Sequence, residues 1–196
     1  MITEKDTIKC EAVFNDTKTH RLLWKRVWDK DKPLACVITI HPSISDNIVM
    51  DTTTFLTVNG IANLEEFGGV ILVNLFSLLT SKLQMRWARD IDINDPENDN
   101  YIKKAADDAA IVILAWGRGV AQNARISNRA DQVVELLAPH KEKLCVISDG
   151  EKTHLHPLSP SCRNIVWKLE PFRKLETEEK DTATDAENDA IENVPT

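Results

Sequence analysis

Apolar and polar positions along this chain follow two different periods. Four short runs are almost entirely apolar and rich in β-branched residues: 34–40 (LACVITI), 69–76 (GVILVNLF), 109–116 (AAIVILAW) and 143–148 (KLCVIS). Strands covered on both faces have this pattern. Segments with helical signals separate the runs, so the sequence predicts βα units around a parallel sheet.

Three helices are predicted between and after these strands. Asp51 is placed to cap a helix that extends through Phe67. Asp95, with Pro96 at the first helical position, precedes a second helix over YIKKAADDAA. The third helix is predicted from about residue 127 to residue 138.

Both ends of the folded region predict further strands. Residues 12–28 (AVFNDTKTHRLLWKRVW) favour an N-terminal hairpin or edge strands with a turn near Asn15-Asp16, and NIVWKLEPF predicts a last short strand. The predicted fold class is therefore α/β, a three-layer sandwich with a central, mainly parallel four-stranded sheet.

The net charge of −7 is unevenly distributed. From Lys174 to Thr196 there are eight acidic residues and two lysines, so this tail carries −6 and the rest of the chain is close to neutral. The tail has too few apolar residues to offset the entropy cost of ordering it. We predict one domain over residues 1–172 and an acidic, disordered tail over residues 173–196 that solvates the chain, with a regulatory or DNA-mimicking role as the alternative.

The four cysteines lack the C-x-x-C spacing of a zinc site, and two of them lie inside apolar runs (Cys10, Cys36, Cys145, Cys162). They are expected to be reduced thiols of a cytoplasmic protein. No leader sequence opens the chain, and no apolar run approaches the ~18 residues that span a bilayer. We therefore expect no contact with a membrane.

The candidate chemistry lies in the segments that follow the strands. In an open α/β sheet, ligands bind outside the carboxyl ends of the strands. The segments at this edge are 41–46 (HPSISD), Asn74, 116–122 (WGRGVAQ) and 154–161 (HLHPLSPS). Their convergence predicts a cleft faced by both His154 and His156.

These motifs carry a resemblance to two families. The order of motifs over roughly residues 34–161 is similar to that of the uracil-DNA glycosylase superfamily. The motifs are a strand followed by x-P, then L-V-N, then W-G-x-x-A-Q and finally H-P-x-S-P. The chain more closely resembles a bacterial and phage group catalogued as domain-of-unknown-function family 1643. The segments that carry this resemblance are TIHPSISD, VNLFSLLTSKL, NDPENDNYI, AWG and HPLSPS. The first resemblance implies a glycosylase-like fold, and the second carries no activity.

The glycosylase resemblance also implies roles for single residues. Asn74 matches the amide that reads a base, and His156 matches the histidine that donates to a developing negative charge. His41 stands where the superfamily has an Asp or Asn that positions water. Phe55 lies where the superfamily has a base-stacking Phe, although helical periodicity favours a position in the core.

Two loops complete the candidate site. Pro42 and Ser43 follow His41 and are expected to contact the ligand. The loop that enters the duplex in glycosylases corresponds to Leu158, Ser159 and Pro160, for which burial is the alternative. The glycine-containing turn could bind phosphate through its backbone amides or could be only a tight turn (Gly117, Arg118, Gly119).

Histidines at positions i and i+2 of a strand point the same way, so His41, His154 and His156 form an alternative metal set. No carboxylate or thiolate companion is evident in the sequence. We therefore predict no metal and no cofactor.

The expected function is that of a uracil-DNA glycosylase-like pseudo-enzyme without glycosylase activity. Its cleft would bind a protein partner, such as a DNA-mimicking glycosylase inhibitor, or nucleic acid. The near-neutral domain disfavours tight non-specific duplex binding, which depends on several phosphate contacts. The alternatives are an active enzyme on a modified base or nucleotide that uses His41 or His156 with Asn74, and a small-molecule or phosphate binder that uses the Gly117–Gly119 turn.

Overall fold

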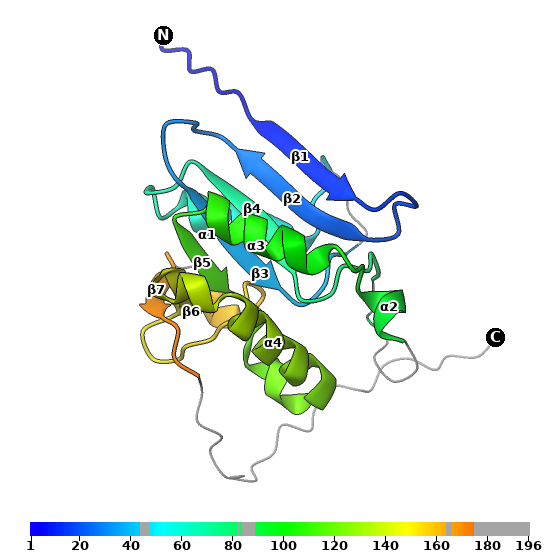
Figure 1. Cartoon of the computed structure of the whole chain (residues 1–196). Coiled ribbons are helices and arrows are strands. Elements are labelled where there is room, and N and C mark those ends of the chain that lie inside the picture. Colours follow the sequence, from blue (N-terminus) through cyan, green and yellow to red (C-terminus); the bar gives the residue numbers. More distant parts are fainter. Residues whose placement is uncertain (44–47, 82, 84–88, 164–165, 175–196) are drawn as a thin grey trace, which may run out of the picture.

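A computed structural model describes residues 1–43, 48–81, 83, 89–163 and 166–174. Seven strands form one sheet in the order β1-β2-β4-β3-β5-β6-β7 (Figure 1). They are β1 Lys9–Phe14, β2 Arg21–Val27, β3 Leu34–Thr39, β4 Gly69–Asn74, β5 Ile111–Leu114, β6 Leu144–Ser148 and β7 Lys168–Pro171. The helices are α1 Thr52–Ala62, α2 Asp90–Ile93, α3 Asn98–Asp108 and α4 Ala124–Leu136, with short 3₁₀ helices at Arg118–Gln122, Ala138–Lys143 and Pro160–Cys162.

The sheet is mixed. β3 runs parallel to both β4 and β5, and β5 runs parallel to β6. β2 is antiparallel to β1 and β4, and β7 is antiparallel to β6. The α/β class is confirmed, but the sheet has seven strands where the sequence predicted four, because the N-terminal hairpin and the last short strand join it directly.

Apolar side chains fill both faces of the sheet. One core contains residues of α3 and α4, such as Ile102 and Val133, packed against one face. The other contains Ile61 of α1 and Trp167 against the opposite face. Alternate residues of the central strands enter opposite cores, which explains why these strands are apolar along their whole length.

The first helix is capped as predicted but is shorter. Asp51 accepts a hydrogen bond from the backbone amide of Thr54 at 3.1 Å. The helix ends at Ala62 instead of Phe67. Glu65 adopts a left-handed conformation with φ of 60°, which turns the chain back and allows Phe67 to enter the core.

The other two helix starts also differ from the sequence expectation. Asp95 accepts a hydrogen bond from the Glu97 amide at 3.0 Å, so it caps a turn, and α3 begins only at Asn98. The side chain of Asn123 accepts from two backbone amides of the first turn of α4, which therefore starts at Ala124. At α4 the side chain that satisfies the free amides therefore decides where the helix starts, whereas the N-cap residue of α3, Glu97, makes no side-chain capping hydrogen bond.

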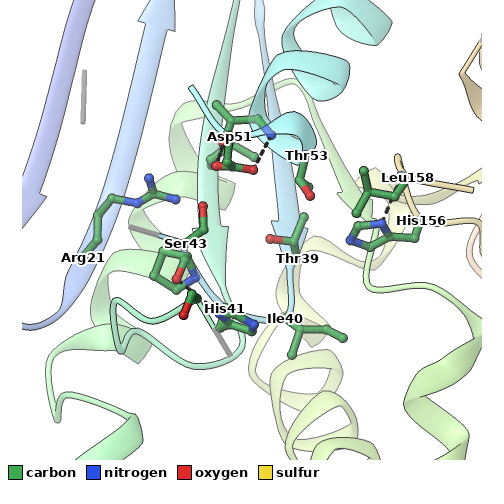
Figure 2. A pocket seen from close by; sticks show the side chains of 13 residues that line it. Arg21, Thr39, Ile40, His41, Ser43, Asp51, Thr53, His156 and Leu158 are labelled. Atoms are coloured by element: carbon green, nitrogen blue, oxygen red, sulfur yellow. Dashed lines mark hydrogen bonds between the residues drawn. The ribbon is translucent and has the colours of Figure 1, made fainter. Parts of the chain in front are cut away.

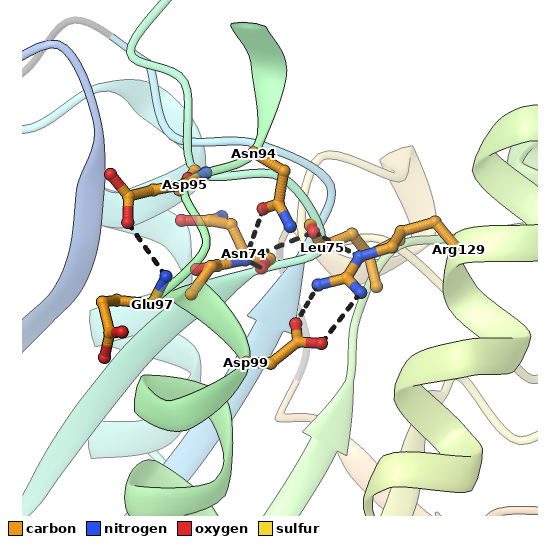
Figure 3. A network of polar contacts seen from close by, with 9 residues as sticks. Asn74, Leu75, Asn94, Asp95, Glu97, Asp99 and Arg129 are labelled. Carbon is orange, nitrogen blue, oxygen red and sulfur yellow. Dashed lines mark hydrogen bonds and ion pairs between the residues drawn. The ribbon is translucent and has the colours of Figure 1, made fainter. Parts of the chain in front are cut away.

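Buried polar contacts join α3 and α4 to the end of β4 (Figure 3). Asn98, which is fully buried, donates to the carbonyl oxygen of Asn74 at 3.0 Å. Arg129 donates to the carbonyl oxygen of Leu75 at 2.9 Å and forms an ion pair with Asp99. The carbonyl groups that β4 leaves without strand partners are therefore satisfied by two helices.

The predicted acidic tail lies outside the described residues, except for its first two positions. The carbonyl oxygen of Arg173 is 2.9 Å from His154 Nε2, and Lys174 forms an ion pair with Asp131 at 2.9 Å. These two residues pack against the domain. The disorder predicted for the rest of the tail stays a prediction.

Two further expectations concern the environment of the chain. All four cysteines are free, and Cys10 is exposed whereas Cys36, Cys145 and Cys162 are buried. Across the described part of the chain, none of the helices combines the length and the apolar character needed to cross a membrane. The cytoplasmic location stays a prediction.

Asn98→Ala should lower the free energy of unfolding by about 1–3 kcal/mol, because it leaves a buried carbonyl group without its donor. Asn100→Ala is the matched control, since Asn100 lies on the same helix with an exposed hydrogen bond to Glu97. Urea denaturation with an unchanged m-value would measure both. An equal loss in the two variants would contradict a stabilising role for the Asn98 contacts.

Candidate functional site

A polar cavity of about 280 Å³ lies at the edge of the sheet where β3 and β4 end (Figure 2). β2 is antiparallel to β4, so the beginning of β2 reaches the same edge. The walls come from β2, β3 and β4, the start of α1 and the segments that follow β3, β4 and β6. They consist of Arg21, Thr39, Ile40, His41, Pro42, Ser43, Asp51, Thr53, Thr54, Leu72, Ser81, His156 and Leu158. This is the edge where open α/β sheets bind ligands.

Asp51 supplies a carboxylate to the cavity. Its two oxygens accept hydrogen bonds from the amide and the hydroxyl of Thr54, at 3.1 and 2.7 Å. Burial alone would raise the pKa of this carboxyl, but the hydrogen bonds outweigh burial and hold the pKa below its ordinary value. Asp51 is therefore ionised at neutral pH.

Arg21 is a buried cation in the wall of the same cavity. Its side chain extends towards Asp51 (Figure 2), and the residue is only 3% exposed. Burial lowers the pKa of its guanidinium to about 10, and the negative charge of Asp51 acts in the opposite direction. Arg21 is still charged at neutral pH, so the opposite charges of Arg21 and Asp51 balance at the pocket.

His156 presents a neutral N–H donor. Its Nδ1 atom accepts a hydrogen bond from the backbone amide of Leu158 at 3.0 Å, so the proton of the neutral ring is on Nε2. Burial lowers the pKa of His156, and Asp51 only partly counteracts this. In Figure 2 the second ring nitrogen lies on the side of Thr39. The loop thus fixes both the tautomer and the direction of the ring.

Two local features hold the His156 loop in place. The hydroxyl of Ser159 accepts from the His156 amide at 3.2 Å, and the Ser159 amide donates to the His156 carbonyl at 2.8 Å. Gly117 approaches from the end of β5 with φ of 79°, and a Cβ atom at this position would lie 2.9 Å from the Cβ of His156. Gly117 therefore has a steric role in supporting the histidine.

The other two residues of the glycine-containing turn are placed differently. Neither Arg118 nor Gly119 is among the residues that line the cavity, and Arg118 is exposed. A Cβ atom on Gly119 would meet nothing within 4 Å. The geometry thus fits the tight-turn interpretation better than a phosphate-binding role.

His41 has the opposite tautomer to His156. Its Nδ1 atom lies 3.1 Å from the carbonyl oxygen of Pro42 and must donate there, which leaves Nε2 of the neutral ring as an acceptor. His41, Pro42 and Ser43 all line the cavity, and their contact with a ligand stays a prediction. The pocket therefore has one imidazole that accepts and one that donates.

Asn74 lies behind the cavity wall and does not line it. It is 2% exposed, and its Nδ2 atom donates to the Thr39 hydroxyl at 2.6 Å. Within the described residues, Oδ1 of Asn74 is buried without a hydrogen-bond partner. Because the Thr39 oxygen accepts from Asn74, the Thr39 hydroxyl proton is available to the cavity. Asn74 thus contacts Thr39 and not the space a ligand would occupy.

Two other predicted residues lie away from the cavity. Phe55 is 48% exposed on α1, outside both cores and absent from the cavity wall. His154, buried and with φ of 59°, approaches the Arg173 carbonyl with Nε2 and packs edge-on against Phe172. The prediction that both histidines of the loop face the cleft is therefore wrong for His154, because the two histidines lie on an irregular loop and not on a strand.

The leucine-containing loop is divided between the cavity and the surface. Leu158 lines the cavity and is half-buried, whereas Ser159 stabilises the turn and Pro160 is exposed. Among the residues whose positions are described, no three His, Cys, Asp or Glu side chains gather closely enough to hold a metal ion.

Sequence reasoning missed Arg21 and Thr39 and assigned Asp51 only to helix capping. Arg21 had one weak signal, a charge directly before the apolar run Leu22-Leu23-Trp24. Its place at the pocket depends on the pairing of β2 with β4, which no local pattern specifies.

Fold and pocket together define an α/β protein with a polar cavity at the carboxyl edge of its parallel strands. The chain belongs to the family described as "Protein of unknown function (DUF1643)", whose match covers residues 21–158. Every residue of the cavity wall lies within this range. No curated protein and no solved structure matches the chain.

Gly117→Ala should displace His156 and lower the free energy of unfolding by about 1–2 kcal/mol or more, because any side chain is strained at this φ. Gly119→Ala, two residues further on, should leave both properties unchanged. Imidazole resonances in NMR spectra and chemical denaturation measure the two effects. Unchanged His156 resonances in Gly117→Ala would contradict the proposed support.

The lowered pKa of His156 makes stability depend on pH. Because the unfolded chain has an ordinary histidine pKa of about 6.5, it binds protons that the folded protein excludes, and stability falls as the pH is lowered through this value. His156→Asn should reduce this dependence between about pH 7 and pH 5. Denaturation midpoints across that range test this, and an unchanged slope in the variant would contradict it.

Proposed function

We propose that this protein is a glycosylase-like pseudo-enzyme whose pocket binds an uncharged, nucleobase-type heterocycle. The ligand is a free base, a nucleoside or a base turned out of a nucleic acid strand. The observation that carries the proposal is the arrangement of donors in the pocket: the fixed Nε2–H of neutral His156, the hydroxyl of Thr39 and the guanidinium of Arg21. Carbonyl oxygens and ring nitrogens of a base accept from such groups.

Charge and size both support a small, uncharged ligand. Asp51 balances Arg21, and His156 is neutral, so the pocket does not favour a net ionic ligand. A cavity of about 280 Å³ is close to the lower end of the range of roughly 300–1,000 Å³ found for small-molecule sites. His41 adds an acceptor for an N–H group of the base.

Several features argue against excision of uracil. His41 occupies the place where the glycosylase superfamily has a water-positioning Asp or Asn. Asn74 bonds to Thr39 behind the cavity wall, and Phe55 points into solvent. A glycosylase requires groups that position water, read the base, stack on it and donate to it. Of the residues at the corresponding places, His156 and the replacement His41 line the cavity, whereas Asn74 and Phe55 do not.

A protein partner such as a DNA-mimicking glycosylase inhibitor has less support. Such a partner would grip the leucine-containing loop, yet Leu158 is half-buried and forms part of the cavity wall. A partner that withdrew Leu158 would also remove a wall of the ligand site. Partner binding and ligand binding would then exclude each other.

A second candidate function is catalysis on a modified base or nucleotide. The opposite tautomers of the two cavity histidines favour it, because His41 Nε2 can take a proton and His156 Nε2–H can give one. Incubation with deoxyuridine-containing oligonucleotides and with modified nucleosides tests this candidate, with an active glycosylase as positive control. Turnover that is lost in His41→Ala would replace the pseudo-enzyme proposal with this second function.

His156→Asn should weaken binding of uracil, thymine, hypoxanthine or their nucleosides by about tenfold, the effect of roughly one lost hydrogen bond. Asparagine retains an acceptor for the Leu158 amide but lacks the Nε2–H donor. The matched control is His154→Asn, outside the pocket, where asparagine tolerates the positive φ. Calorimetric or NMR titration measures both, and failure of every compound to bind the wild-type protein would contradict the proposed function.

A further inference from the structure

The outer edge of β1 is a candidate interaction surface, far along the sheet order from β3 and independent of the proposed function. In the described part of the chain, β1 pairs only with β2, and it forms one edge of the sheet (Figure 1). Its first three residues, Lys9, Cys10 and Glu11, are exposed. The outer edge of such a strand presents backbone N–H and C=O groups to any strand that can align with it.

This edge is less protected against pairing than the opposite edge of the sheet. The opposite edge, β7, has only four residues and ends at Pro171. β1 has six residues and no proline, and its single irregularity lies between Val13 and Phe14. Its first half is therefore regular, and Ile8, just before it, is 55% exposed. Short strands, prolines, bulges and charged side chains are the usual protection, and of these the regular first half of β1 has only the charges of Lys9 and Glu11.

The charges on this strand complement each other in one antiparallel self-pairing. When two copies of β1 align about a two-fold axis at Cys10, Lys9 of each copy lies opposite Glu11 of the other, and Ile8 lies opposite Ala12. Opposite charges placed directly across a pair of strands stabilise it. We propose that β1 binds β1 of a second copy in this register, so that one sheet continues through a symmetric dimer.

The same charges disfavour the neighbouring registers. An axis at Lys9 places two lysines opposite each other, and an axis at Glu11 places two glutamates opposite each other. Inside the chain, Glu11 already lies across from Lys25 of β2. In the proposed dimer Glu11 lies between Lys25 and Lys9 of the second copy, so charges alternate across three strands.

A contact made by one strand from each copy buries a small area. Dimers held by such small interfaces are weak, so the fraction of dimer rises with the protein concentration. The dimer is therefore expected to dissociate on dilution, and its equilibrium can be followed with the full chain in solution.

Sedimentation equilibrium of the wild-type chain, over concentrations up to about 1 mM, the range of weak association, should show monomer and dimer. Glu11→Lys should weaken association by about tenfold or more, because two attractive contacts become repulsive at once. The double variant Lys9→Glu with Glu11→Lys restores opposite charges and should restore association. Circular dichroism checks that the fold of each variant is intact.

Cross-linking gives a second readout of the register. Cys10 is the exposed cysteine and the other three are buried, so a short bis-maleimide should join two chains through Cys10. Cys10→Ser should abolish the cross-link and leave sedimentation unchanged. A wild-type chain that is monomeric throughout, or a dimer that is insensitive to Glu11→Lys, would overturn the proposal.

Discussion

The carboxylate of Asp51 is the group on which the pocket depends. It caps α1 through Thr54, and its charge offsets the buried guanidinium of Arg21. A buried cation without a nearby anion would be strongly destabilising. The same carboxylate acts on His156 but does not overcome the effect of burial, so the ring stays neutral. One side chain thus determines where the helix starts and what charge the cavity holds.

The predictable parts of the fold are the segments in which every residue has the same solvent exposure. Central strands are covered on both faces, so every residue from Val70 to Val73 is apolar and the run is recognisable without knowing its neighbours. His156, which lines the cavity, was also singled out, because it follows a predicted strand within a distinctive motif. The position of its proton could not be predicted from the sequence, because a backbone amide two residues later sets the tautomer.

The unpredicted parts depend on contacts between distant segments. Phe55 occupies an apolar position in the helical pattern, which predicted that it faces the core. The buried face of α1 is instead formed by Thr54, Thr57, Gly60 and Ile61. The periodicity of large apolar residues therefore predicted the wrong face of this helix. Gly60 lies against Trp167, which needs a residue without a side chain. Small and hydroxyl-bearing residues pack as well as large ones when a bulky partner comes from elsewhere.

A further set of contacts joins the sheet edge to the pocket. Arg26 of β2 donates to the sulfur of Cys10 on β1 at 3.3 Å and to the sulfur of Met50 at 3.1 Å. Met50 directly precedes Asp51, the carboxylate at the pocket. These neighbours are in physical contact, yet coupling between two sites requires an element with two alternative arrangements. The Arg26 side chain, which stacks on Trp24 at 5.3 Å, is held from several directions. These contacts hold one arrangement of Arg26, so they give no basis for coupling between the proposed edge contact and the pocket.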